Sequence, residues 1–153
     1  MEGSPGSARR GNICQTATAG KPAGTSVELK AILLDSDIAI EILRKRDKTI
    51  QTRWDDVAAT DTLLLYSPVS AAEIWHGTRE AERELVTAWF AVMTCVPIDA
   101  AIGVRAGEYL RQFHRSHALQ LGDALIAATA AIHGLHLWTR NRKHYPMRDI
   151  HLL

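Results

Sequence analysis

Short apolar runs alternate with helix-patterned segments from residue 31 to the C-terminus, and this alternation constrains the fold more than any other feature. Ala31–Leu34 is continuously apolar, as expected of a strand buried on both faces of a parallel sheet. Further strand signals occur in TLLLYSPVS, closed by Pro68, and in CVPID, LHLWT and DIHLL. Repeated strand–helix alternation predicts an α/β fold with three layers, in which helices flank a mainly parallel central sheet.

Helices are predicted between these strands from apolar spacing and from capping residues. One carries Ile38, Ile42 and Leu43 at helical spacing and ends in the basic run of residues 44–46, and a second covers roughly residues 48–59. Ser70 and Glu73 have capping-box spacing and are predicted to open a helix through Trp75. In residues 80–94 one helical stripe is predicted to face the core, and it consists of Leu85, Trp89, Phe90 and Met93.

Two later helices have clear end signals. Asp99 is placed to cap a helix that continues through Phe113. The Ala-rich segment GDALIAATAAIHG is predicted to be a helix that Gly134 ends as the residue after its last turn.

The composition indicates one globular domain preceded by a tail. Residues 1–28 are rich in Gly, Ser, Ala, Thr and Pro without apolar periodicity, so we expect a disordered tail or a wrongly assigned start. Residues 29–153 then form a single domain. No apolar run approaches the roughly 20 residues that span a bilayer, which argues against membrane insertion. Two cysteines provide no disulfide framework, and a reducing cytoplasm fits best.

The net charge of +1 does not by itself indicate a nucleic-acid-binding protein. Basic side chains nevertheless cluster near the C-terminus, where the sequence TRNRKHYPMR contains Arg140, Arg142, Lys143, His144 and Arg148. This cluster is either an ordinary solvated surface or a local site for phosphates.

Three acids occupy positions where ligand sites form in parallel sheets. Asp35 follows the first strand, Glu73 lies just beyond the second, and Asp123 opens the Ala-rich helix. Sites in such folds lie outside the carboxyl ends of the strands, so the three could meet. Each could instead be a helix cap. Clustered carboxylates repel one another unless a cation is present, and an all-oxygen ligand set favours Mg²⁺ or Mn²⁺ over zinc.

Three segments together resemble the PIN-domain ribonucleases, specifically the VapC toxins of toxin–antitoxin pairs. They are LLDSDIAIEIL, SPVSAAEIWHG and LGDALIAATAAIHGLHLWTRNRKHYP. The resemblance extends over residues 31–153, and the third segment is its most specific part.

The resemblance implies a metal-dependent endoribonuclease that acts as the toxin of a type II toxin–antitoxin pair. It assigns Asp35, Glu73 and Asp123 to the metal site, with Mg²⁺ or Mn²⁺ as cofactor, and places Asn141 at a fourth catalytic position. Asp37 is then a capping or supporting group. The implied partners are RNA, a cognate antitoxin and a second copy of the chain. Phosphates beside the cleaved bond would be held by Arg140, Arg142 and Lys143.

Two other functions compete with this one. A strand followed by Asp-x-Asp also begins phosphatases of the haloacid dehalogenase type, but Ala39 stands where a hydroxyl or β-branched residue is expected and the later motifs of that class are not convincing. A non-catalytic PIN-like binding module is the second alternative. A module that only binds a partner would have no need for three acids without basic partners.

Overall fold

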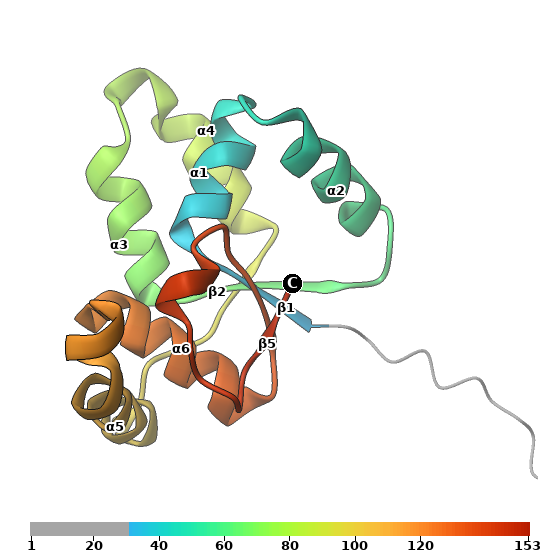
Figure 1. The fold of residues 1–153 in the computed structure, drawn as a ribbon. Helices are drawn as coiled ribbons and strands as arrows, with labels where there is room; N and C mark the ends of the chain where they lie inside the picture. Colours follow the sequence, from blue (N-terminus) through green and yellow to red (C-terminus); the bar gives the residue numbers. More distant parts are fainter. Residues whose placement is uncertain (1–30) are drawn as a thin grey trace, which may run out of the picture.

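The fold is a five-stranded parallel sheet with helices on both faces, as predicted (Figure 1). The computed structural model describes residues 31–153, so the prediction for residues 1–28 lies outside the described part. The strand order is β3-β2-β1-β4-β5, and every paired neighbour is parallel. The strands are β1 (Ala31–Leu34), β2 (Leu63–Tyr66), β3 (Thr94–Cys95), β4 (His136–Trp138) and β5 (His151–Leu152).

Helices connect the strands. Between β1 and β2 lie α1 (Ser36–Arg44) and α2 (Lys48–Ala58), and between β2 and β3 lie α3 (Pro68–Gly77), the short 3₁₀ helix η1 (Glu80–Glu82) and α4 (Arg83–Ala91). The connection from β3 to β4 consists of α5 (Ala100–His117) and α6 (Leu121–His133), and a second 3₁₀ helix, η2 (Arg142–His144), follows β4. Among residues 31–153, no helix is both long enough and apolar enough to cross a membrane.

Successive residues of β1 supply the two sides of the core. Leu33 packs with Leu65 and Leu137 against α5 and α6, whereas Ile32 and Leu34 pack on the other face against α1 and α2. This alternation follows from the two-residue period of a strand. Figure 1 shows α5 and α6 below the sheet and the four helices α1 to α4 above it. The continuous apolar run is therefore explained by burial on both faces.

The start of α3 differs from the prediction. Ser67, not Ser70, is the N-cap, and its hydroxyl accepts from Ser70 N at 3.1 Å. Pro68 is the first residue of α3 rather than the end of β2. The predicted capping box of Ser70 and Glu73 is therefore wrong. The physical reason is that proline suits the first helical position, where its missing N–H costs nothing.

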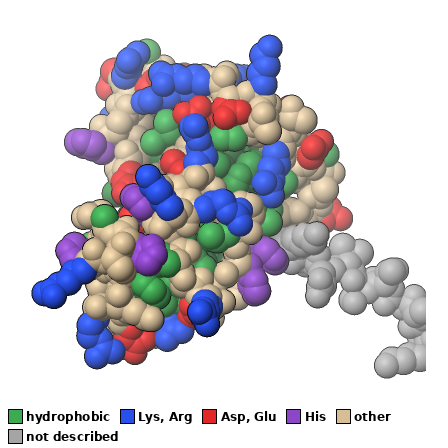
Figure 2. All heavy atoms as spheres, viewed as in Figure 1, with side chains coloured by type: hydrophobic (Ala, Val, Ile, Leu, Met, Phe, Trp, Pro, Cys, Tyr) green, Lys and Arg blue, Asp and Glu red, His purple; other side chains and the backbone are tan. Residues whose placement is uncertain are grey.

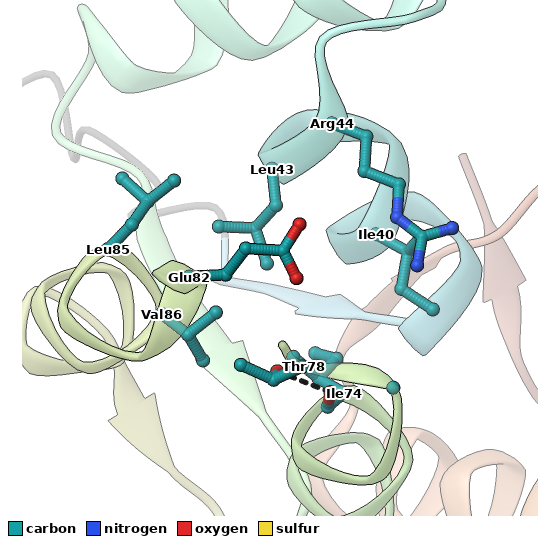
Figure 3. Close-up of a pocket in the computed structure, with 9 residues that line it drawn as sticks. Ile40, Leu43, Arg44, Ile74, Thr78, Glu82, Leu85 and Val86 are labelled. Carbon is teal, nitrogen blue, oxygen red and sulfur yellow. Dashed lines mark hydrogen bonds between the residues drawn. The ribbon is translucent and has the colours of Figure 1, made fainter. Parts of the chain in front are cut away.

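The predicted core stripe of α4 is only partly correct. Trp89, Phe90 and Met93 are partly buried, but Leu85 is 56% exposed. It lies at an apolar groove between α1, α3 and α4, close to Leu43 and Val86 (Figure 3). Spacing alone predicts which residues share a helix face, but not how far the neighbouring elements cover that face.

Candidate active site

Polar residues follow three adjacent strands at one edge of the sheet. Asp35, Ser67 and Thr139 come directly after β1, β2 and β4, whose last residues Leu34, Tyr66 and Trp138 are in register. All three polar residues are buried. Because the strands are parallel, their carboxyl ends meet at one edge. This edge is where ligand sites form in sheets of this kind.

Asp35 is the most enclosed acid of the edge, at 5% exposure. Its carboxylate accepts from Ser36 N at 2.8 Å and from the Tyr145 hydroxyl at 2.8 Å. Burial raises the pKa of Asp35 above its ordinary value, hydrogen bonds from Tyr145, Thr139 and Ser36 lower it in part, and the charge of Asp123 raises it again. Asp35 is thus also the N-cap of α1. The capping contact with Ser36 N uses only one of the two carboxylate oxygens of Asp35.

Asp37 faces the same edge from the first turn of α1. Its Oδ2 accepts from Arg140 N at 3.0 Å, while its buried Oδ1 has no hydrogen-bond partner among the described residues. Burial, followed by the charge of Asp35, raises the pKa of Asp37 to about 6. A buried carboxylate oxygen without a donor is costly, so this side chain has unused capacity to bind a cation or a donor.

Glu73 and Asp123 come from two packed helices, α3 and α6. A Cβ built on Gly122 would lie 3.2 Å from Glu73 Oε1, which places the Glu73 carboxylate directly over the first turn of α6. Asp123 is in that turn and accepts from Gln120 N at 3.4 Å, so its capping role is real but weak. Glu73 is exposed, and the Asp123 side chain is 25% exposed.

Asn141 is connected to the acids through His144. Its Nδ2 lies 2.7 Å from His144 Nδ1, and the same imidazole nitrogen lies 3.5 Å from Asp123 Oδ2. An amide nitrogen only donates, so neutral His144 accepts from Asn141 in this orientation. A protonated His144 would instead donate to Asp123. The fourth predicted position is therefore beside the acids.

The three predicted RNA-binding residues differ in how free they are. Arg140 forms an ion pair with Glu41 at 3.1 Å, and Arg142 donates to the Leu153 carbonyl at 2.9 Å. Lys143 is exposed, and among residues 31–153 it has no ion pair. Only Lys143 is therefore available without breaking an existing contact.

Sequence reasoning missed Tyr145. It is 3% exposed, and its hydroxyl bonds to Asp35 although the two residues are 110 positions apart in the chain. Burial and the charge of Asp35 raise the pKa of Tyr145 far above the ordinary tyrosine value, so the hydroxyl stays a donor. The only signal was an aromatic residue within the basic cluster, which does not specify a contact with Asp35.

The chemistry of these donors suits a hard divalent cation. Asp35, Asp37, Glu73 and Asp123 supply carboxylate oxygens, and within residues 31–153 none of the four is paired with a lysine or arginine. As the described side chains lie, no three Asp, Glu, His or Cys groups converge on one point. Glu73 and Asp123 must therefore turn towards Asp35 to share an ion, and their exposure permits this.

The chain matches known proteins over most of its length. Residues 32–149 match the PIN domain family. Ribonuclease VapC10 of Mycobacterium tuberculosis is 42% identical over 118 residues, which are 76% of this chain and 86% of that protein. Ribonuclease VapC19 of the same organism is 27% identical over 122 residues, covering 75% of this chain and 92% of the relative.

Solved structures of low sequence identity share the fold. VapBC2 of Rickettsia felis, bound to a promoter DNA fragment, has a TM-score of 0.65 at 19% identity and covers 80% of this chain and 97% of that one. VapBC-1 of nontypeable Haemophilus influenzae has a TM-score of 0.66 at 19% identity, covering 80% and 96%. These structures show the shared fold, and the family match with the 42% identical relative establishes that this chain belongs to the PIN-domain family, in its VapC-type branch.

Proposed function

We propose that this protein is a divalent-metal-dependent endoribonuclease and that it acts as the toxin of a toxin–antitoxin pair. The observation that carries the proposal is the gathering of unneutralised carboxylates from β1, α3 and α6 at one sheet edge, in a chain 42% identical to a VapC ribonuclease. The VapBC complexes that share this fold support an antitoxin as partner. We place the reaction in the cytoplasm.

Asp35, Glu73 and Asp123 would hold the cation, with Asp37 as a further oxygen donor. A bound Mg²⁺ or Mn²⁺ supplies charge neutralisation at the phosphate and lowers the pKa of a water molecule. The tyrosine hydroxyl and the Ser36 amide fix the orientation of the Asp35 carboxylate. This fixed orientation is the pre-organisation that a positively charged ligand requires.

The reaction is hydrolysis of a phosphodiester. In-line attack by water on phosphorus breaks the bond to the 3′ oxygen, which leaves as a 3′-hydroxyl, and the phosphate stays on the 5′ end of the other fragment. His144 lies between Asn141 and Asp123, so it is placed to exchange a proton at Nδ1 beside the carboxylates. Lys143, exposed next to His144, is placed to hold a neighbouring phosphate.

Expression of the chain without an antitoxin tests the proposal. We expect growth arrest, and we expect Asp35→Asn or Asp123→Asn to relieve it because each removes one negative charge from the cation site. Asp47→Asn is the matched control, because Asp47 only caps α2. Undiminished toxicity of both site variants, present as soluble protein, would reject the proposal.

A further inference from the structure

Two grooves meet at the C-terminal end of α5. The first, of about 390 Å³, lies between the end of α5 and η2 and is lined by Arg115, His117, Lys143 and His144 among others. The second, of about 640 Å³, runs between α5 and the segment before β5 and is lined by Phe113, His117 and Arg148 among others. His117 lines both, so the two grooves are neighbours on either side of this residue, and we call them together the α5 trough.

The trough leads to the candidate active site. His144, in the wall of the first groove, is the residue that contacts Asn141 and lies 3.5 Å from Asp123. A strand whose phosphate lies at the carboxylates can therefore continue into the trough past His144. Figure 2 shows lysine, arginine and histidine side chains gathered over α5 and the C-terminal segment.

The cations of the trough are available for a ligand. Arg115, Lys143 and Arg148 are exposed, and among residues 31–153 none of them forms an ion pair. Arg105, by contrast, is bonded to Glu108 and Asp149. The first groove is lined by no acidic residue of the described chain, and the two acids that line the second groove, Glu108 and Asp149, are both paired with Arg105. The dipole of α5 favours a positive charge at its C-terminal end, which explains Arg115. It does not explain Lys143 and Arg148, because these residues come from another segment.

The trough also offers flat surfaces. Phe113 is partly buried against the core, and the exposed ring of His117 meets it edge to face, with ring centroids 5.8 Å apart. Alternation of free cations with aromatic faces is the pattern by which proteins hold single-stranded nucleic acid without reading its sequence. An acidic peptide would use the cations but would gain little from the rings.

We propose that the α5 trough binds the single-stranded RNA substrate on one side of the cleaved phosphate, with Arg115, Lys143 and Arg148 contacting phosphates and His117 stacking on a base. The inference rests on the proposed ribonuclease function. It extends the binding surface beyond the basic cluster around Asn141 to the end of α5.

Binding of a fluorescent single-stranded RNA oligonucleotide to the full chain tests the proposal. The measurement is anisotropy at several salt concentrations, in EDTA so that no RNA is cleaved. Arg115→Glu should weaken binding about tenfold or more and lower the slope of log K against log salt by about 0.7 for each phosphate that the variant no longer neutralises. Arg46→Glu is the matched control, because Arg46 is exposed between α1 and α2. It should change binding far less.

His117→Ala is a second, independent variant, since it removes a ring from an exposed position. It should weaken binding severalfold with little change in the salt slope, because stacking releases no counterions. Parental affinity and slope in both trough variants would overturn the proposal. So would an equal reduction in Arg46→Glu, or an Arg115→Glu variant that binds a polyglutamate peptide more weakly but RNA as well as the parent does.

Cleavage by Asp35→Asn separates this proposal from the one on which it rests. If Asp35→Asn abolishes cleavage while the trough variants bind RNA normally, the ribonuclease function stands and the trough is rejected. If Asp35→Asn cleaves RNA at the parental rate, the proposed site itself is wrong.

Discussion

Two pairs of carboxylates border the same space, and the fold holds them in opposite ways. Asp35 and Asp37 follow β1 in buried or half-buried positions, and burial raises both of their pKa values. Glu73 and Asp123 are carried by α3 and α6, where solvent reaches them. The first pair costs stability and is fixed in place. The second pair costs little and is free to turn, so a cation can complete the site by drawing the second pair towards the first.

The largest expected effect tests whether the solvent-exposed pair, Glu73 and Asp123, binds the cation or consists of ordinary surface acids. Glu73→Gln keeps the shape of the side chain and removes its charge. RNA cleavage should fall by roughly 10²-fold or more, comparable to the loss of a major electrostatic group in an active site. The free energy of unfolding should change by less than about 1 kcal/mol, because Glu73 is exposed and Ser67 provides the cap.

Glu80→Gln is the control, since Glu80 is a surface acid of η1 with a side chain 91% exposed. Parental cleavage by Glu73→Gln across a range of Mg²⁺ concentrations would remove Glu73 from the site.

A smaller effect is expected when Asp35 loses the hydrogen bond that holds its carboxylate in place. Tyr145→Phe removes the hydroxyl that donates to Asp35 at 2.8 Å and leaves a buried carboxylate oxygen short of a donor. Cleavage should fall about tenfold, and the protein should lose about 1–3 kcal/mol of stability at neutral pH, the usual cost of an unmet buried hydrogen bond. Chemical denaturation and initial cleavage rates measure both. Tyr66→Phe is the control, because the Tyr66 ring packs on Phe90 and its hydroxyl makes no hydrogen bond to Asp35; it should leave cleavage unchanged.

The pH dependence of the free energy of unfolding measures what it costs to keep Asp37 charged in the folded protein. Because the folded protein raises the pKa of Asp37 to about 6, it binds a proton more readily than the unfolded chain does. The resulting stabilisation is fully present below the ordinary aspartate pKa of about 3.9 and is lost as the pH rises through about 6. The difference between these two pKa values is worth at most about 3 kcal/mol. Solvent around the half-buried side chain screens part of it, so we expect the metal-free protein to lose about 2 kcal/mol from this group over that window.

Asp37→Asn should abolish that part of the loss and make the metal-free protein more stable at pH 7, because the amide oxygen can still accept from Arg140 N. Thermal melts in EDTA at several pH values provide the measurement. An unchanged pH profile would show that Asp37 is well solvated.

The smallest effect concerns the packing that places the solvated pair. In Gly122→Ala the added Cβ would lie 3.2 Å from Glu73 Oε1 and 3.3 Å from Val69 Cγ1. The Glu73 side chain must then shift by a few tenths of an ångström, and cleavage should fall a few-fold while the helix propensity of alanine offsets the strain. Gly103→Ala, where a Cβ would meet nothing within 4 Å, should leave cleavage unchanged.

The sequence was sufficient to predict the sheet and most helices, because the apolar periods of β1, β4 and α6 are set by burial on the two faces of the sheet. The cap of α3 was assigned three residues too late, although Pro68 pointed to Ser67. The exposure of Leu85 could not be predicted, because it depends on the distance between α1 and α4 rather than on the pattern within α4.

The candidate site, like the fold, could be predicted only in part. Asp35 could be placed because a charge directly after a buried strand needs a reason, and Asp123 because it opens a helix. The contact of Tyr145 with Asp35 could not be predicted, since it joins residues 110 positions apart through a loop without regular pattern. The ion pair between Arg140 and Glu41 could not be predicted for the same reason.

Cleavage of an end-labelled single-stranded RNA as a function of Mg²⁺ concentration tests the central claim most directly. The account predicts no cleavage in EDTA, cleavage that rises and saturates with Mg²⁺, and fragments bearing a 5′-phosphate and a 3′-hydroxyl, with all activity lost in Asp35→Asn. Cleavage at the same rate in EDTA, or fragments ending in a 2′,3′-cyclic phosphate, would contradict a cation held by these carboxylates.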